Sequence, residues 1–243
     1  MGIPCELCRP DLKKRRSSFK PAMGAALFEP KVLHMVNSDS GLRRLFAAIV
    51  NGDDNLVSQL LSRSPGLSVA CLGAGATRKT ASSFYLALIG RYLWAGDTAL
   101  HIAAAAYQTK IVRKLLSAGA DVHARNRLGD EPLHAAAVGQ PGSRMWNARA
   151  QAQTLRRLVA AGANPNALNK TGVSPLHRTI RCRCAEAVRT LLECGADPDL
   201  RNKNGSMPIL LATRNTGRGG TGLPEAKLQQ KMILRLLESY VRG

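Results

Sequence analysis

The nine residues GDTALHIAA at positions 96–104 decide the fold, because similar stretches return further along the chain. They return as GDEPLHAAA at 129–137 and GVSPLH at 172–177, and a degenerate copy, GSMPILLA, occupies 205–212. The leading glycines of the first two copies lie 33 residues apart, as do those of the last two, while 43 residues separate the second copy from the third. Repetition at a fixed period of this size indicates an array of stacked units.

Each copy carries the start and stop signals of two helices. Thr98 and Ser174 stand where an N-cap is needed, and the residue after Ser174 is a proline, which is tolerated at the first helical position. Downstream, the apolar pairs at 111–112 and 115–116 form one helical stripe. Glycines that can adopt the left-handed conformation then end the second helices, at Gly119, Gly162 and Gly195.

This pattern resembles the ankyrin-repeat family, whose units are about 33 residues long and share a T-P-L-H-x-A core. The resemblance covers residues 96–243 clearly and residues 40–70 more faintly. The GRGG segment at 217–220 is also similar to segments in stand-alone bacterial ankyrin proteins. The resemblance implies an all-α solenoid of helix-turn-helix units joined by short β-turn fingers.

We expect residues 1–38, which include KKRR at 13–16, to form a basic, disordered tail. A single repeat domain at 39–243 follows. It is predicted to contain a degenerate N-terminal cap unit, an insertion with an extra helix at 81–93, three full units and a C-terminal cap unit, since terminal repeats are atypical. The expected bounds are 39–70, 71–95, 96–128, 129–171, 172–204 and 205–243.

Two substitutions depart from the residue pattern of the repeat, and two loops interrupt its period. Glu131 and Met207 replace the capping threonine, so we expect weaker helix starts there. The loops at 140–149, which contain an exposed Trp146, and at 216–224 fall at the same position in their units. We therefore expect both loops to project from one side, where they would form a second contact surface.

The chain is strongly basic, with a formal charge of +19 from 35 Lys and Arg against 16 Asp and Glu, and the excess is spread along its length. Such a surface favours acidic proteins, nucleic acid or anionic membranes. No apolar run reaches the roughly 20 residues that span a bilayer, and the N-terminus lacks the apolar core of a signal peptide. We therefore expect a cytoplasmic monomer, or a nuclear one in a eukaryote, with reduced cysteines.

Three sequence patterns are similar to metal-binding or cofactor-binding motifs but lack the structural context that those motifs need. Cys5 and Cys8 form half of a zinc ligand set, and whether they bind a metal stays open. The segment GRGGTG at 217–222 matches a dinucleotide-binding motif, but a helix rather than a strand precedes it. The histidine of each unit is too far from the next to share an ion, because neighbouring helices pack about 8–10 Å apart. We expect no enzyme activity, no cofactor and no metal site.

The family resemblance implies a structural role for these histidines. In ankyrin repeats this side chain bonds to the threonine of its own turn and to the neighbouring backbone. The positions expected to be structural are Gly96, His101, Gly129, His134, Gly172, His177 and Gly205.

The same resemblance implies partner binding through the finger tips and the exposed face of the first helices, where Cys182 accompanies Arg181. Carried over position by position, the predicted binding residues are Arg125, Arg127, Leu128, Lys170, Thr171, Arg181, Arg201, Lys203, Asn204 and Arg214. Basic residues without an acidic neighbour at the tips predict a scaffold or adaptor that binds an acidic segment of a protein. Two alternatives stay open: a nucleic-acid-associated protein, although aromatic residues for base stacking are lacking, and a regulator or inhibitor of an enzyme.

Overall fold

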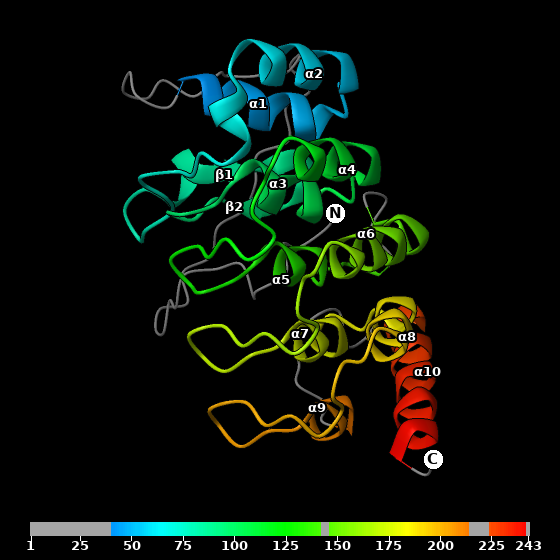
Figure 1. Ribbon diagram of the computed structural model, residues 1–243. Helices are drawn as coiled ribbons and strands as arrows, with labels where there is room; N and C mark the ends of the chain where they lie inside the picture. The colour runs from blue at the N-terminus through cyan, green and yellow to red at the C-terminus, as the bar shows by residue number, and fades with distance from the viewer. Residues whose placement is uncertain (1–39, 142–145, 214–223, 242–243) are drawn as a thin grey trace.

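The computed structural model describes residues 40–141, 146–213 and 224–241, and these form a stack of helix pairs (Figure 1). The first helices of the pairs are α1 (Ser40–Asn51), α3 (Ala99–Ala105), α5 (Pro132–Ala136), α7 (Pro175–Arg181) and α9 (Pro208–Thr213). The second helices are α2 (Asp54–Arg63), α4 (Thr109–Ser117), α6 (Ala148–Ala160), α8 (Ala185–Glu193) and α10 (Pro224–Val241). The predicted all-α repeat architecture is confirmed.

Each unit buries its apolar face against the next. The first helices contact one another in succession from α1 to α9, and the second helices do so from α2 to α10. Leu100, Leu133 and Leu176 occupy the same place in successive units, and all three are fully buried. A continuous core therefore runs through the stack, and no unit can bury its own apolar stripe alone.

The predicted caps are present. The hydroxyls of Thr98 and Ser174 accept hydrogen bonds from the N–H groups of the histidines three residues later. The glycines that end α4, α6 and α8 have positive φ, as predicted: 83° at Gly119, 100° at Gly162 and 85° at Gly195.

The insertion before α3 is not the helix that we expected at 81–93. It contains short 3₁₀ turns at Ala81–Phe84 and Ala87–Ile89 and an antiparallel hairpin of β1 (Tyr85–Leu86) and β2 (Arg91–Tyr92). The rings of Tyr85 and Tyr92 pack across the strands with centroids 4.9 Å apart. Aromatic residues suit such cross-strand pairs, and Gly90 turns the chain in the left-handed conformation with φ 59°.

The hairpin is joined to the stack by buried apolar side chains and lies on the same side as the fingers (Figure 1). Phe84, Leu93 and Trp94 are all buried in the common core. A further 3₁₀ turn, Pro65–Ser68, follows α2. The insertion is thus a folded part of the repeat stack.

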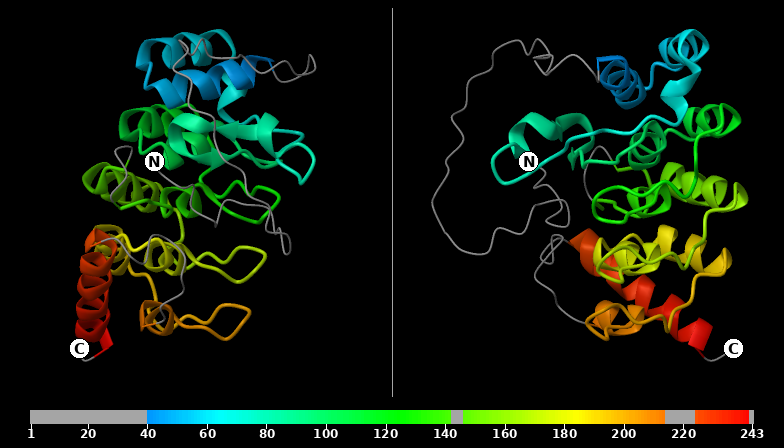
Figure 2. Two further views of the ribbon diagram at one scale, coloured as in Figure 1. Left: turned by 180° about the vertical axis from the view of Figure 1, so that it is seen from behind. Right: turned by 60° about the vertical axis from the view of Figure 1, so that its left-hand side comes forward.

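Between the second helix of one unit and the first helix of the next, the chain runs out and back as an extended loop. We call the loops at 120–130, 163–173 and 196–206 the fingers; they project in parallel from one edge of the stack (Figures 1 and 2). Within the described residues, no helix is both long and apolar enough to cross a membrane. The predicted tail at 1–38 with its Cys5–Cys8 pair, most of the loop at 216–224 and residues 142–145 lie outside the described residues.

Candidate functional site

The finger tips are held in register by backbone hydrogen bonds. Arg127, Lys170 and Lys203 occupy equivalent positions, two residues before the leading glycine of each following unit. Their N–H groups donate to the carbonyls of Ala95, Leu128 and Thr171 in the preceding loop, at 2.6, 3.0 and 3.4 Å. The same three residues are exposed to solvent. We call Arg127, Lys170 and Lys203 the basic row.

Two glycines let successive fingers approach closely. Gly129 and Gly172 have φ values of 75° and 71°, which favour glycine. A Cβ added at Gly129 would lie 2.8 Å from the backbone N of Lys170 and 2.9 Å from its Cγ. At Gly172 the corresponding distances to Lys203 are 2.6 and 2.9 Å. The stem of each lysine therefore lies against the glycine of the finger before it.

An asparagine fastens each of the first two fingers to the preceding unit. Asn126 Nδ2 donates to Asp97 Oδ1 at 2.8 Å, and Asn169 Nδ2 donates to Asp130 Oδ1 at 2.9 Å. The Oδ1 atoms of the same asparagines accept N–H bonds from residues two and four positions later in their own turns. Each asparagine therefore shapes its turn and also ties that turn to the core.

A buried arginine balances each of these carboxylates, and the two arginines come from different elements. Arg178 of α7 donates to both oxygens of Asp130 at 2.7 Å. Arg91 of β2 donates to both oxygens of Asp97 at 3.0 and 3.2 Å. Arg178 stands six residues after its leading glycine, where the preceding unit has Ala135. The hairpin thus supplies the cation that the next repeat does not.

The surroundings of Asp130 keep it ionised. Burial alone would raise the pKa of this carboxyl, but Arg178, His134 and the amide of Asn169 favour the charged form and lower its pKa to about 2. Since Asp97 and Asp130 directly follow the leading glycine, and an asparagine stands three residues before the next one, this network had a sequence signal. This attachment was not predicted from the sequence.

The repeated histidines bridge consecutive units. In His101 and His177, Nδ1 lies 2.9 and 2.7 Å from the hydroxyl of the capping Thr98 or Ser174. The Nε2 atoms of His101, His134 and His177 bond to the carbonyls of Asp130, Val173 and Ser206, respectively, each in the next unit. Burial lowers the pKa of all three rings, to about 4 at His134, where Arg178 adds to the effect. The rings are therefore neutral at neutral pH.

The comparisons with known proteins agree with this geometry. A family model for the ankyrin repeat matches residues 95–127, and a model for multiple ankyrin repeats matches residues 158–212. The protein contains ankyrin repeats. A search of curated proteins returned no match to the chain. Ankyrin repeats generally mediate protein–protein interactions and are typically non-catalytic modules.

In this ankyrin stack, the predicted binding residues Arg125 and Arg127 make side-chain contacts within the protein. Arg125 forms an ion pair with Glu131 at 2.8 Å, although about half of its side chain stays exposed. Arg127 donates to the carbonyl of Ala76 at 3.0 Å, and its guanidinium lies 5.0 Å from the centre of the Trp94 ring. The insertion therefore fixes the direction of Arg127.

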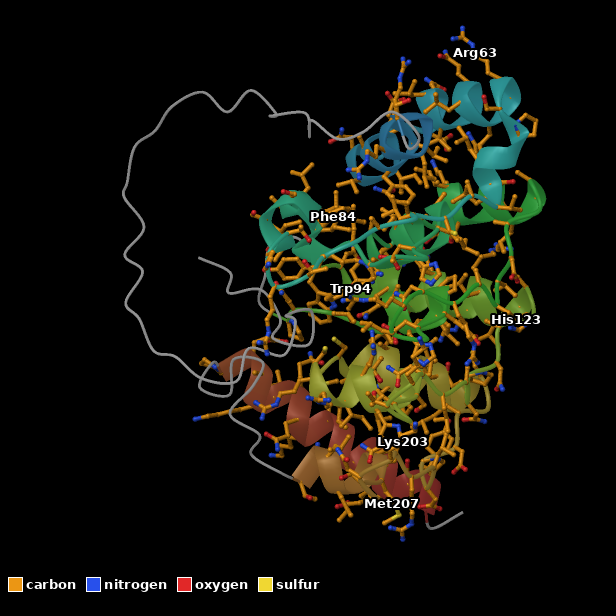
Figure 3. All side chains as sticks on the ribbon, turned by 90° about the vertical axis from the view of Figure 1, so that its left-hand side faces the viewer. Arg63, Phe84, Trp94, His123, Lys203 and Met207 are labelled. Carbon is orange, nitrogen blue, oxygen red and sulfur yellow. The ribbon has the colours of Figure 1, made fainter. Side chains whose placement is uncertain are left out.

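The lysines of the basic row differ from these arginines. Among the described residues, neither Lys170 nor Lys203 has a side-chain hydrogen bond or ion pair with another group. Figure 3 views the stack with the fingers facing the reader and labels Lys203. Both ammonium groups are thus available to a ligand.

The remaining predicted residues lie in varied surroundings. Thr171, Arg201 and Asn204 are exposed, and Arg201 donates to the carbonyl of Gly205 at 3.1 Å. Leu128 and Arg181 are half-buried. Arg214 lies outside the described residues.

Cys182 is buried, contrary to the expectation that it would lie on an exposed face. Cys182 is the residue that follows α7 as its C-cap. Helix α10 packs against α8, and Gln229 of α10 accepts a hydrogen bond from the N–H of Ala185 at 2.8 Å.

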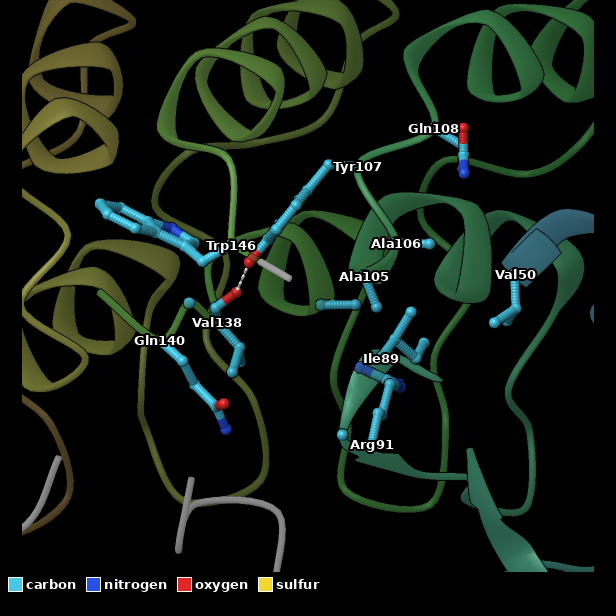
Figure 4. A pocket seen from close by; sticks show the side chains of 13 residues that line it. Val50, Ile89, Arg91, Ala105, Ala106, Tyr107, Gln108, Val138, Gln140 and Trp146 are labelled. Carbon is cyan, nitrogen blue, oxygen red and sulfur yellow. Dashed lines mark hydrogen bonds between the residues drawn. The ribbon is translucent and has the colours of Figure 1, made fainter. Parts of the chain in front are cut away.

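Trp146 is half-buried, whereas we expected it to be exposed. Its indole N–H donates to Gln151 Oε1 at 2.9 Å, and a Cβ at Gly139 would lie 2.7 Å from that nitrogen. Trp146 lines a cavity of about 130 Å³ together with Tyr107, Val138 and Gln140 (Figure 4). This volume is below the range of typical small-molecule sites.

Proposed function

We propose that the protein binds an acidic segment of a partner protein along the basic row. The observation that carries the proposal is the equivalence of Arg127, Lys170 and Lys203: three cationic side chains at one position of three stacked loops. No acidic residue occupies the tip positions at 125–128, 168–171 and 201–204. A carboxylate that approaches the tips therefore meets a surface of one sign.

The row is also ordered before a partner arrives. The lysine stems pack on Gly129 and Gly172, and Arg127 is stacked on Trp94. Side chains that are already restricted lose less conformational entropy on binding than free ones. Of the flanking arginines, Arg125 contributes less net charge because Glu131 pairs with it.

The test is a charge reversal that leaves the packing of Trp94 intact. In the Lys170→Glu/Lys203→Glu variant, binding of a labelled oligoglutamate peptide, followed by fluorescence anisotropy, is expected to be lost. Circular dichroism should show unchanged helicity and melting, because both ammonium groups are exposed. Adding Arg127→Glu should remove any residual binding.

The matched control is Lys110→Glu/Arg113→Glu, which changes the net charge equally at exposed positions of α4. It should bind the peptide almost as well as the parent protein. Equal losses in the two variants would show that general attraction to a basic protein, rather than the row, holds the peptide. Preferential binding of single-stranded RNA, with an affinity that falls steeply with salt concentration, would contradict the protein-binding proposal.

A further inference from the structure

The three cations of the basic row are spaced by the repeat itself. Each is fixed by the same backbone hydrogen bond to the loop before it, and the first helices behind the loops pack in succession. Packed helices lie about 8–10 Å apart. The charges therefore recur along the edge of the stack at a step of about 10 Å.

This step matches an extended chain. A chain in the extended polyproline II conformation advances about 3.1 Å per residue with three residues per turn, so every third side chain returns to the same face about 9 Å further on. An α-helix rises 1.5 Å per residue and needs roughly seven residues for the same distance. The two conformations therefore require different spacings of acidic residues in a partner.

We infer that the basic row selects an extended segment with acidic residues at every third position, i, i+3 and i+6; this rests on the proposed function. Consecutive carboxylates would face Arg127, Lys170 and Lys203 in turn. The two residues between them would lie over the tips without an ion pair.

The groups beside the lysines favour an extended partner over a helical one. Thr171 and Asn204 follow the two lysines and are exposed. The Asn204 amide has no side-chain partner among the described residues, and Thr171 Oγ1, which donates to Asn169, can still accept a hydrogen bond. These groups can bond to the open backbone of an extended peptide, whereas a helix uses its backbone groups internally.

The lysines cannot easily gather around a single cluster of acids. Their stems lie against Gly129 and Gly172, so each ammonium starts from its own finger. Arg127 is held by Trp94 and Ala76, which leaves the rest of its guanidinium to bind a carboxylate with two parallel bonds. A contiguous acidic run should therefore pair well with one residue of the basic row and poorly with the other two.

The experiment uses the full chain and three labelled peptides of equal length and charge, built on the same Gly-Ser background. Each has three glutamates, placed at every third position, contiguously, or at every seventh position. We expect the first peptide to bind about tenfold more tightly than the contiguous one, the effect of about two exposed ion pairs. Lys170→Glu/Lys203→Glu should abolish this preference, and Lys110→Glu/Arg113→Glu should preserve it.

The outcomes separate the spacing from the proposed function. If all three peptides bind equally and lose binding in the row variant, the spacing inference is overturned while acidic-segment binding stands. Tightest binding of the seven-residue spacing would likewise overturn it in favour of a helical partner. If no peptide binds, or binding ignores the row variant, the proposed function fails, and the spacing fails with it.

Discussion

The fingers at 163–173 and 196–206 have the same turn but different attachments. In both, an asparagine Oδ1 accepts N–H bonds from residues two and four positions later. Asn169 also donates to the buried Asp130, whereas Asn202 Nδ2 has no partner among the described residues. The shape of a finger is therefore a local property, and its anchoring depends on the preceding unit.

The difference comes from two substitutions. Val173 stands where the earlier units have Asp97 and Asp130, and Leu211 stands where the preceding unit has Arg178. Both members of the ion pair are absent together, so neither leaves an uncompensated buried charge, which would be costly. The last finger therefore lacks this attachment, and no buried charge of the pair is left unpaired.

Breaking the attachment of the finger at 163–173 to Asp130 should reduce stability the most. Asp130→Ala leaves Arg178 buried without its carboxylate, so we expect a loss of about 3–5 kcal/mol in the free energy of unfolding. Val173→Ala, the matched change in the next unit, should cost about 1 kcal/mol. Urea unfolding followed by circular dichroism measures both. Equal costs would show that the ion pair does not anchor the finger.

The second-largest effect should be a loss of stability in acid. The unfolded chain protonates His134 near pH 6.5, while the folded ring, with its pKa lowered to about 4 by burial and Arg178, stays neutral. The stabilisation is complete above pH 6.5 and falls by about 3 kcal/mol between pH 6.5 and 4. The lowered pKa values of His101 and His177 act in the same direction. Unfolding free energies measured across this range should slope downward with acid, less steeply in His134→Gln.

A matched pair of asparagine variants compares the two fingers directly. Asn169→Ala removes a hydrogen bond to an ionised carboxylate as well as the turn bonds, whereas Asn202→Ala removes turn bonds alone. We expect the first variant to lose about 2 kcal/mol more than the second, the usual contribution of a hydrogen bond to a charged group. Similar losses, measured by urea unfolding, would mean that the attachment to Asp130 adds little.

The smallest expected difference concerns the contact between fingers. Gly172 and Gly205 have φ values of 71° and 70°, so alanine is strained equally at both. A Cβ at 172 would lie 2.6 Å from Lys203 N, while nothing lies within 4 Å of a Cβ at 205. Gly172→Ala should therefore be about 1 kcal/mol less stable than Gly205→Ala. It should also weaken peptide binding, because Lys203 must move.

The sequence predicted what the repeats share. Gly96 and Gly129 set the register, and Thr98 and Ser174 marked helix starts, which the structure confirms. His101, expected to be structural, hydrogen-bonds to Thr98 and to the carbonyl of Asp130. These features repeat, so the periodic pattern reveals them several times. The positions of the basic row followed from the same register, while their role in binding stays a prediction.

Features that occur once were predicted poorly. The hairpin at 85–92 was taken for a helix, since a short apolar run does not distinguish the two by periodicity. The contacts of Arg127 with Trp94, and of Arg91 with Asp97, depend on how that hairpin folds back on the stack. Long-range contacts of this kind leave no local pattern in the sequence.

The hairpin's Arg91 also determines how the protein can be divided. A truncation that starts at residue 96, where the clear repeats begin, would keep Asp97 but remove the guanidinium that neutralises it. It would also remove Trp94, on which Arg127 rests. A fragment that keeps these contacts must therefore include the hairpin, and an exchange of this repeat with another ankyrin repeat would have to carry the hairpin along.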